Sequence, residues 1–145
     1  MILDDLHAVL LDLAGMLNRP QPDLALLQAA GVKLDRALFP LLSRVALNEP
    51  VGVGELGELV GRDYSTVSRQ VAKLESLGLV ERRKSAVDSR VNEARLTEAG
   101  RALVERLAVA RRTLAGEALA DWSQEDLETL VRLLRRLAGS ANSVT

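Results

Sequence analysis

The sequence predicts a mainly α-helical fold with one small β-hairpin. Leucines recur at alternating spacings of three and four residues near both ends of the chain, as they do on helices that pack against other helices. In the middle, two short helical patterns lie on either side of a tight turn and are followed by two short extended segments. With 145 residues, the chain has room for one domain and an appended oligomerisation element.

The composition argues against an enzyme and against a metal site. The chain has no cysteine and a single histidine, His7, so it lacks thiolate ligands, a histidine cluster and the usual parts of a catalytic triad. It also lacks a phosphate-binding loop of the form G-x-x-x-x-G-K. We therefore expect no catalytic residue, no metal and no cofactor.

The start of the chain predicts neither export nor a membrane anchor. Residues 1–17 carry three aspartates and no lysine or arginine, whereas a secretory signal begins with basic residues. No apolar run in the sequence approaches the roughly 18 residues that a membrane span needs. The expected location is the cytoplasm, with no membrane partner.

The first helix is predicted over residues 1–17, because leucines form one stripe along it. The stripe consists of Leu3, Leu6, Leu10, Leu13 and Leu17. Pro20 and Pro22 predict a break over residues 18–23, since proline lacks an amide donor and disfavours helical geometry in the residue before it. A short apolar stretch follows and is interrupted at Gly31.

A second helix is predicted after Asp35, which is placed to cap it. Its expected buried face consists of Leu38, Leu41, Leu42 and Val45. Pro40 lies inside this pattern, and the sequence leaves open whether the helix bends there or begins later than Asp35.

A short third helix is expected over residues 55–60, with Gly61 placed to end it. The residues expected to face inward are Leu56, Leu59 and Val60. Gly57 lies inside this helix and costs about 1 kcal/mol relative to alanine, so the helix must depend on its neighbours.

A tight turn over residues 62–64 joins this helix to a longer one over residues 65–77. Gly78 followed by the apolar Leu79 is typical of a helix end. The outcome is a helix, a turn and a helix, the second of which is the longer.

Two extended segments, residues 79–84 and 92–96, are joined by a polar loop over residues 85–90 and predict a two-stranded hairpin. Thr97 can cap a long helix that runs to about Leu119. The apolar stripe of this helix consists of Leu103, Leu107, Ala110 and Leu114.

Ser123, with Asp126 three residues later, opens a last helix. Its stripe repeats the spacing of the first helix and consists of Leu127, Leu130, Leu134, Leu137 and Ala141. Matching stripes at both ends of a small chain predict dimerisation, the alternative being a monomeric antiparallel bundle.

Basic charge is concentrated in the middle of the chain. Residues 62–101 hold nine lysines and arginines against six acidic residues, a net charge of +3, whereas residues 1–61 hold four against eight, a net charge of −4. Such an asymmetry can mark an anionic partner.

The helix predicted over residues 65–77 has an apolar side and an opposite polar side. The apolar side consists of Val67, Val71 and Leu74, and the polar side of Thr66, Arg69, Gln70 and Lys73. Arg69 and Lys73 are four residues apart, so they repel each other unless an anion lies over them. Arginine suits guanine, glutamine suits adenine, and one helix fits the major groove. This pattern predicts a reader of double-stranded DNA, the alternative being an ordinary solvated face.

The predicted hairpin is also cationic. Arg82, Arg83 and Lys84 cluster on its first strand, and Arg90 lies near its tip. An arginine that projects beside a groove-bound helix can reach the neighbouring minor groove. Asp88 is then expected to brace the loop or an arginine, the alternative being a surface turn with a weak ion pair.

These ordered motifs, between about residues 53 and 101, resemble the winged helix-turn-helix of the MarR family, the multiple-antibiotic-resistance type of bacterial regulator. The resemblance is carried by Ser65, Thr66, Val67, Ser68, Arg69, Leu74, Gly78, Leu79, Val80, Arg82, Asp88, Arg90, Leu96, Thr97 and Gly100. The striped helices at the two ends are similar to the family's dimerisation region. Gly54 departs from the family pattern, which often has a serine or threonine cap there, and Gly57 stands where alanine is common.

The resemblance implies a homodimer that binds a pseudo-palindromic operator, usually as a repressor, and that is often released by a small-molecule effector. It divides the chain into an N-terminal dimerisation helix and linker (1–34), a winged helix-turn-helix domain (35–101) and C-terminal dimerisation helices (102–145). The residues expected to contact DNA are Ser65, Thr66, Ser68, Arg69, Gln70, Lys73 and Arg90. Asp88 and Arg82 are expected to support the wing.

In a second hypothesis, the chain has the same winged-helix fold but does not bind DNA. A winged-helix module could use the same surface, or the hairpin edge, to bind an acidic protein. A salt titration on random duplex DNA separates the two hypotheses, since binding to DNA phosphates has a systematic dependence on salt.

Overall fold

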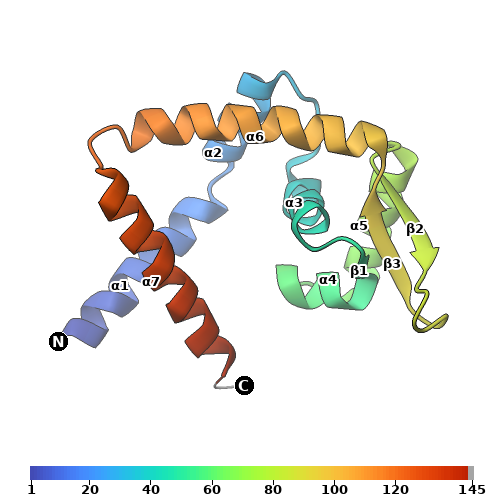
Figure 1. Cartoon of the computed structure of the whole chain (residues 1–145), viewed down its shortest axis with the longest axis horizontal. Helices are drawn as coiled ribbons and strands as arrows, with labels where there is room; N and C mark the ends of the chain where they lie inside the picture. The colour runs from blue at the N-terminus through green and yellow to red at the C-terminus, as the bar shows by residue number, and fades with distance from the viewer. Residues whose placement is uncertain (144–145) are drawn as a thin grey trace. The chain divides into compact units, whose positions relative to one another are not determined.

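The computed structural model describes residues 1–143 and is mainly helical, with one small antiparallel sheet (Figure 1). The elements in chain order are α1 (Ile2–Asn18), α2 (Pro20–Ala30), the 3₁₀ turn η1 (Arg36–Leu38), α3 (Phe39–Asn48), β1 (Val51–Gly52), α4 (Val53–Val60), α5 (Tyr64–Ser76), β2 (Val80–Lys84), β3 (Asn92–Leu96), α6 (Glu98–Ala118) and α7 (Gln124–Asn142). The chain divides into two compact units, Met1–Arg111 and Arg112–Thr145, and α6 continues from the first into the second. The predicted fold class is confirmed.

The core of the first unit is built from α3, α4, α5 and the sheet, and it is apolar. Its largest fully buried side chains are Leu41, Leu42, Leu56, Leu74, Val45, Val51, Val53, Val67 and Val71. The predicted buried face of the second helix is confirmed, since Leu38 and its three companions are all buried. Within residues 1–143 no polar or charged residue belongs to the buried set. The apolar side of α5 packs against this core.

The predicted break over residues 18–23 does end α1 at Asn18, but it is shorter than predicted, because α2 begins inside that range. Only Arg19, with extended backbone dihedral angles, separates α1 from α2. Pro20 occupies the first position of α2, where the missing amide hydrogen would have had no partner in any case. Gly31, at φ 65°, ends the helix in the left-handed conformation that glycine adopts readily.

The structure also answers the question that Pro40 left open. Asp35 Oδ1 accepts a hydrogen bond from the amide of Ala37 at 2.9 Å, so Asp35 caps the 3₁₀ turn η1. The α-helix begins later, at Phe39, and Pro40 lies in its first turn. Proline fits there without bending the helix.

In α4 the inward face differs from the prediction. Leu56 is buried, but Leu59 and Val60 are only half-buried, and Val53 at the start of the helix is buried instead. The helix begins at Val53, two residues earlier than predicted, with Gly52 at its N-cap, so Gly54 is not the capping residue.

The packing of α4 requires that position 57 has no side chain. A Cβ atom at Gly57 would lie 2.9 Å from the carbonyl oxygen of Arg62. The amide of Arg62 also donates to the carbonyl oxygen of Gly57 at 2.9 Å. A side chain at this position would therefore push the helix away from the turn that leads into α5.

The wing is a three-stranded sheet, so the predicted two-stranded hairpin is incomplete. Its order is β1-β3-β2, and both pairings are antiparallel. The hairpin pairs Val80 with Leu96 and Lys84 with Asn92, close to the predicted bounds. The additional strand β1 has only two residues, which is too short for an alternating pattern to reveal.

The predicted caps of the last two helices are confirmed. Thr97 Oγ1 accepts from the amide of Gly100 at 3.0 Å, and Ser123 Oγ accepts from the amide of Asp126 at 3.0 Å. In α6, Leu107 and Ala110 of the predicted stripe are buried. By contrast, neither α1 nor α7 contains a buried residue.

Candidate nucleic-acid interface

The start of α5 is held by Asp63, its N-cap residue. Asp63 accepts hydrogen bonds from the hydroxyls of Ser65 and Thr66, each at 2.6 Å, and from the amide of Thr66 at 3.1 Å. The bond from Ser65, followed by those from Thr66, keeps the pKa of the Asp63 carboxyl far below its ordinary value. The carboxylate is therefore charged at neutral pH, where it caps the helix and complements its dipole.

The two faces of α5 are separated as the periodicity predicted. Val67, Val71 and Leu74 are fully buried. The side chains of Ser65, Arg69 and Lys73 are exposed, and those of Thr66, Ser68 and Gln70 are half-buried. Among the ion pairs within residues 1–143, none involves Arg69 or Lys73. The two cations thus lie at the surface, available to an anion.

The wing presents Arg90 to solvent in a fixed orientation. Its side chain is 88% exposed, and it donates from Nε and Nη2 to the two carboxylate oxygens of Asp88, each at 3.0 Å. The amide of Arg90 donates to the same carboxylate at 3.0 Å. This pairing lowers the pKa of Asp88 and raises the pKa of Arg90, so both groups are charged at neutral pH.

Arg82 joins the wing to the central helix. Its Nε donates to Glu75 Oε1 at 2.6 Å, and its Nη1 contacts Ser68 Oγ at 3.4 Å. Glu75 and Ser68 both belong to α5, whereas Arg82 belongs to β2. The structure therefore brings together two of the predicted site residues, Ser68 and Arg82, while Arg90 pairs with Asp88 inside the wing.

Sequence reasoning missed Arg62 as a neighbour of the predicted DNA-reading residues. Its Nη1 donates to Gln70 Oε1 at 2.8 Å and to the carbonyl oxygen of Ala37 at 2.9 Å. The contact spans eight residues and crosses from a turn to a helix, so no periodic pattern reveals it. Asp63 was also missed, although an aspartate three residues before Thr66 fits the rule for helix caps.

Two other features bear on the function. Within the described part of the chain, no group of three or more His, Cys, Asp and Glu side chains is arranged to hold a metal ion. None of the helices in residues 1–143 is long and apolar enough to cross a membrane.

The chain is similar to known transcriptional regulators. A family model described as HVO_A0114 matches residues 34–92. The Bacillus subtilis (strain 168) protein named uncharacterized HTH-type transcriptional regulator YxaD is 33% identical over 104 residues, which are 72% of this chain and 73% of that protein.

Solved structures extend the similarity to nearly the whole chain. A MarR family protein from Bacillus stearothermophilus has a TM-score of 0.77 at 24% identity and covers 97% of this chain and 96% of its own. The PcaV transcriptional regulator from Streptomyces coelicolor, solved in complex with its natural ligand, has a TM-score of 0.62 at 25% identity, with 89% of this chain and 91% of its own covered.

Proposed function

Because this chain belongs to the MarR family of winged helix-turn-helix, DNA-binding transcriptional regulators, we propose that it acts as a homodimeric repressor. Each subunit places α5 in a major groove of a pseudo-palindromic operator, and the two half-sites lie about 10 base pairs apart. Residues 35–101 carry the DNA-binding surface, and residues 1–34 and 102–145 form the dimer.

The observation that carries this proposal is the separation of faces on α5. Its apolar side is fully buried against the core, while Arg69 and Lys73 project from the opposite side without an ion-pair partner in residues 1–143. The major groove is about 12 Å wide and admits one helix. Base edges are read by Arg69 and Gln70, and the hydroxyls of the helix and Lys73 add contacts to phosphates.

Arg90 supplies a second contact from the wing. Because Asp88 holds its guanidinium in one orientation, little side-chain entropy is lost when it enters the minor groove beside α5. Narrow minor grooves attract such a group through their negative potential. Arg82 keeps the wing at a fixed distance from α5 through Glu75.

The dimer is supported by the exposed leucines of α1 and α7. Leu6, Leu10 and Leu13 of α1 are 37–38% exposed, and Leu130 and Leu134 of α7 are 37% and 42% exposed. Isolated helices with such stripes are marginal in water, because their stability comes from packing of the apolar side.

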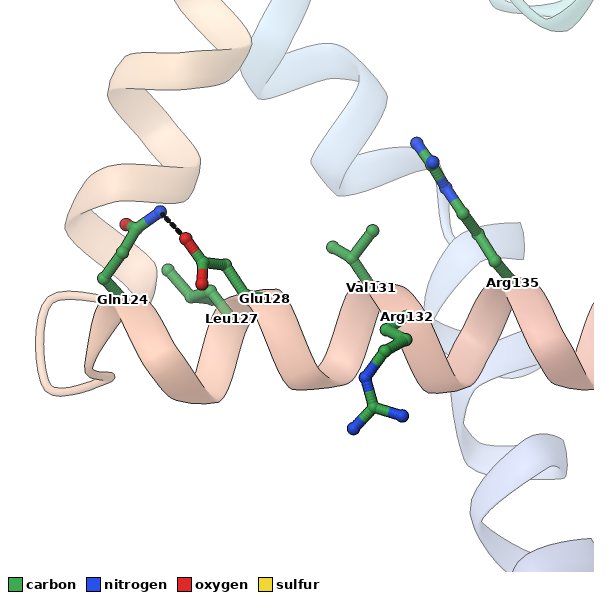
Figure 2. Close-up of a pocket in the computed structure, with 6 residues that line it drawn as sticks. All are labelled: Gln124, Leu127, Glu128, Val131, Arg132 and Arg135. Atoms are coloured by element: carbon green, nitrogen blue, oxygen red, sulfur yellow. Dashed lines mark hydrogen bonds between the residues drawn. The ribbon is translucent and has the colours of Figure 1, made fainter.

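Figure 2 shows the part of α7 that we assign to the dimer interface. Leu127 and Val131 lie on the same side of the helix in an open depression of about 490 Å³, bordered by Gln124, Glu128 and Arg135. Gln124 donates to Glu128 along the rim at 3.2 Å. Arg132 also borders the depression, although its guanidinium points away from Val131. A second copy of the chain covers this apolar side.

The test is to sequence the genomic fragments that the purified protein retains and to measure affinity for the selected site. A palindrome with one-turn half-site spacing is expected. Arg69→Ala should weaken binding by about 1 to 3 kcal/mol and relax specificity at one base pair per half-site. Arg44→Ala, which removes an exposed arginine from α3, should bind normally.

Two results contradict this assignment. Unchanged operator affinity in Arg69→Ala means that α5 does not read the bases. Binding to duplex DNA that shows no dependence on salt, or no binding at all, favours the module that recognises an acidic protein.

We propose further that a small-molecule effector releases the repressor from DNA. A cavity of about 460 Å³ lies between α3 and α6, and it has an apolar lining with one cation. Its lining includes Phe39, Leu42, Leu47, Val104, Leu107, Ala108 and Arg111. This size suits an aromatic acid, whose carboxylate would pair with the guanidinium. The ligand-bound structure of the similar Streptomyces regulator supports such a role.

A panel of phenols and benzoates tests the effector. At least one member is expected to raise the operator Kd by about tenfold. Ala108→Phe should fill the cavity and abolish this response while leaving DNA binding in place, whereas Ala102→Phe, at an exposed position of α6, should respond normally. If no compound changes the Kd, or if Ala108→Phe still responds, the proposed effector site is wrong.

A further inference from the structure

We propose that Arg62 determines base specificity by fixing the side-chain amide of Gln70, so that Gln70 offers a hydrogen-bond donor to the DNA. The inference rests on the proposed function, since it concerns how α5 reads a base. It goes beyond it by assigning a positioning role to a residue that lies outside the recognition helix.

The side chain of Arg62 bridges two elements of the first unit. One guanidinium nitrogen, Nη1, donates both to Gln70 Oε1 at 2.8 Å and to the carbonyl oxygen of Ala37 at 2.9 Å. Arg62 and Gln70 are both half-buried, which shields their hydrogen bond from competing water. Arg62 is therefore held between η1 and α5.

Both ends of Arg62 are anchored. Its amide donates to the carbonyl oxygen of Gly57 at 2.9 Å, and the absence of a Cβ atom at Gly57 allows the turn to lie this close. Ala37 follows Arg36, whose guanidinium donates to Asp23 Oδ2 at 2.9 Å and to the carbonyl oxygen of Asn18 at 2.7 Å. These bonds fix the carbonyl that Arg62 uses.

The chemistry of the pair sets the orientation of the amide. A guanidinium has donors and no acceptor, so only the oxygen end of Gln70 can face Arg62. The amino group is then the end that Arg62 does not hold. Glutamine needs its oxygen and its nitrogen together to pair with adenine in the major groove, whereas its amino group alone suits the acceptors of guanine or thymine.

The resulting prediction is a base preference that depends on Arg62. In the wild type, the base beside Gln70 on the contacted strand should be guanine or thymine, with adenine disfavoured at that strand position. In Arg62→Ala the amide is free to turn, so the preference at that position should shift toward adenine by about two- to tenfold, the effect of one hydrogen bond. Gln70→Ala should erase the preference there, and the double variant should match Gln70→Ala.

The experiment has two arms. The first selects binding sites from a random duplex library with the wild type, Arg62→Ala, Gln70→Ala, the double variant and Arg44→Ala, the last as a control that removes the same charge from an exposed site on α3. The second records the side-chain amide signals of Gln70 by NMR without DNA. The chemical shifts of those signals should change in Arg62→Ala and should stay the same in Arg44→Ala.

The outcomes separate this proposal from the proposed function. A preference change at one shared base pair, together with the shifted amide signals, supports it. A uniform loss of affinity in Arg62→Ala, with a salt slope reduced by about one and unchanged preference, overturns it by showing a phosphate contact. Unmoved Gln70 signals overturn it as well. If the wild type selects no sequence, the proposed function fails and the specificity role fails with it.

Discussion

Leu134→Glu is expected to convert the proposed dimer into monomers and to weaken operator binding by about a hundredfold or more. Leu134 lies on the leucine stripe of α7 and is 42% exposed in the single chain, so the substitution should leave the monomer folded. At a two-fold interface the change occurs twice, and each new carboxylate would be buried without a partner. The loss of affinity follows because two linked half-sites bind about 10² to 10⁴ times more tightly than one.

Sedimentation velocity and titration of labelled operator measure these two effects. Arg136→Glu is the matched control, because it introduces the same side chain at an exposed position of α7 that neither belongs to the leucine stripe nor borders the depression. That variant should remain dimeric and bind DNA normally. A dimer that persists in Leu134→Glu, with circular dichroism showing an unchanged helix content, would mean that α7 does not form the interface.

Gly100→Ala is expected to destabilise the protein by about 3 kcal/mol or more. A Cβ atom at Gly100 would overlap the carbonyl oxygen of Leu79, which already accepts a hydrogen bond from the amide of Thr97 at 3.1 Å. Thr97 Oγ1 also donates to the carbonyl oxygen of Gly78 at 2.6 Å, so the start of α6 is tied to the segment between α5 and β2. Backbone atoms cannot move aside as a flexible side chain can, which places the cost at the upper end for overpacking.

Urea unfolding at one fixed protein concentration measures this difference, since the stability of a dimer depends on concentration. Gly116→Ala, in the same helix, is the control. A Cβ atom there meets nothing within 4 Å, so that variant should gain up to about 1 kcal/mol from helix propensity. Equal stability of Gly100→Ala and the wild type would contradict the close approach of α6 to Leu79.

Much of the DNA-binding region could be predicted from local patterns. The spacing of Val67, Val71 and Leu74 places one side of α5 in the core, and the structure buries all three. A glycine followed by an apolar residue predicted the end of α5, and Gly78, just before Leu79, has a positive φ of 74° there. Thr97 and Ser123 cap their helices because a hydroxyl reaches an amide three residues later, a relation that the sequence displays.

The prolines show where local rules were insufficient. Pro20 and Pro22 were expected to keep the chain out of a helix, yet α2 begins at Pro20. Pro40 likewise lies in the first turn of α3. The same residue type ends one helix or begins the next, and the sequence alone does not distinguish the two uses when helices are separated by one residue.

The residue pattern alone established the helical class, the cationic side of α5 and the leucine stripes of the end helices, because these depend on periodicity within a dozen residues. Long-range packing established the pairing of β1 with β3, the need for glycine at position 57 and the contact of Arg62 with Gln70. Each of these joins atoms from separate elements, and their approach depends on how the core packs. Patterns among residues that are close in the sequence therefore do not reveal these contacts.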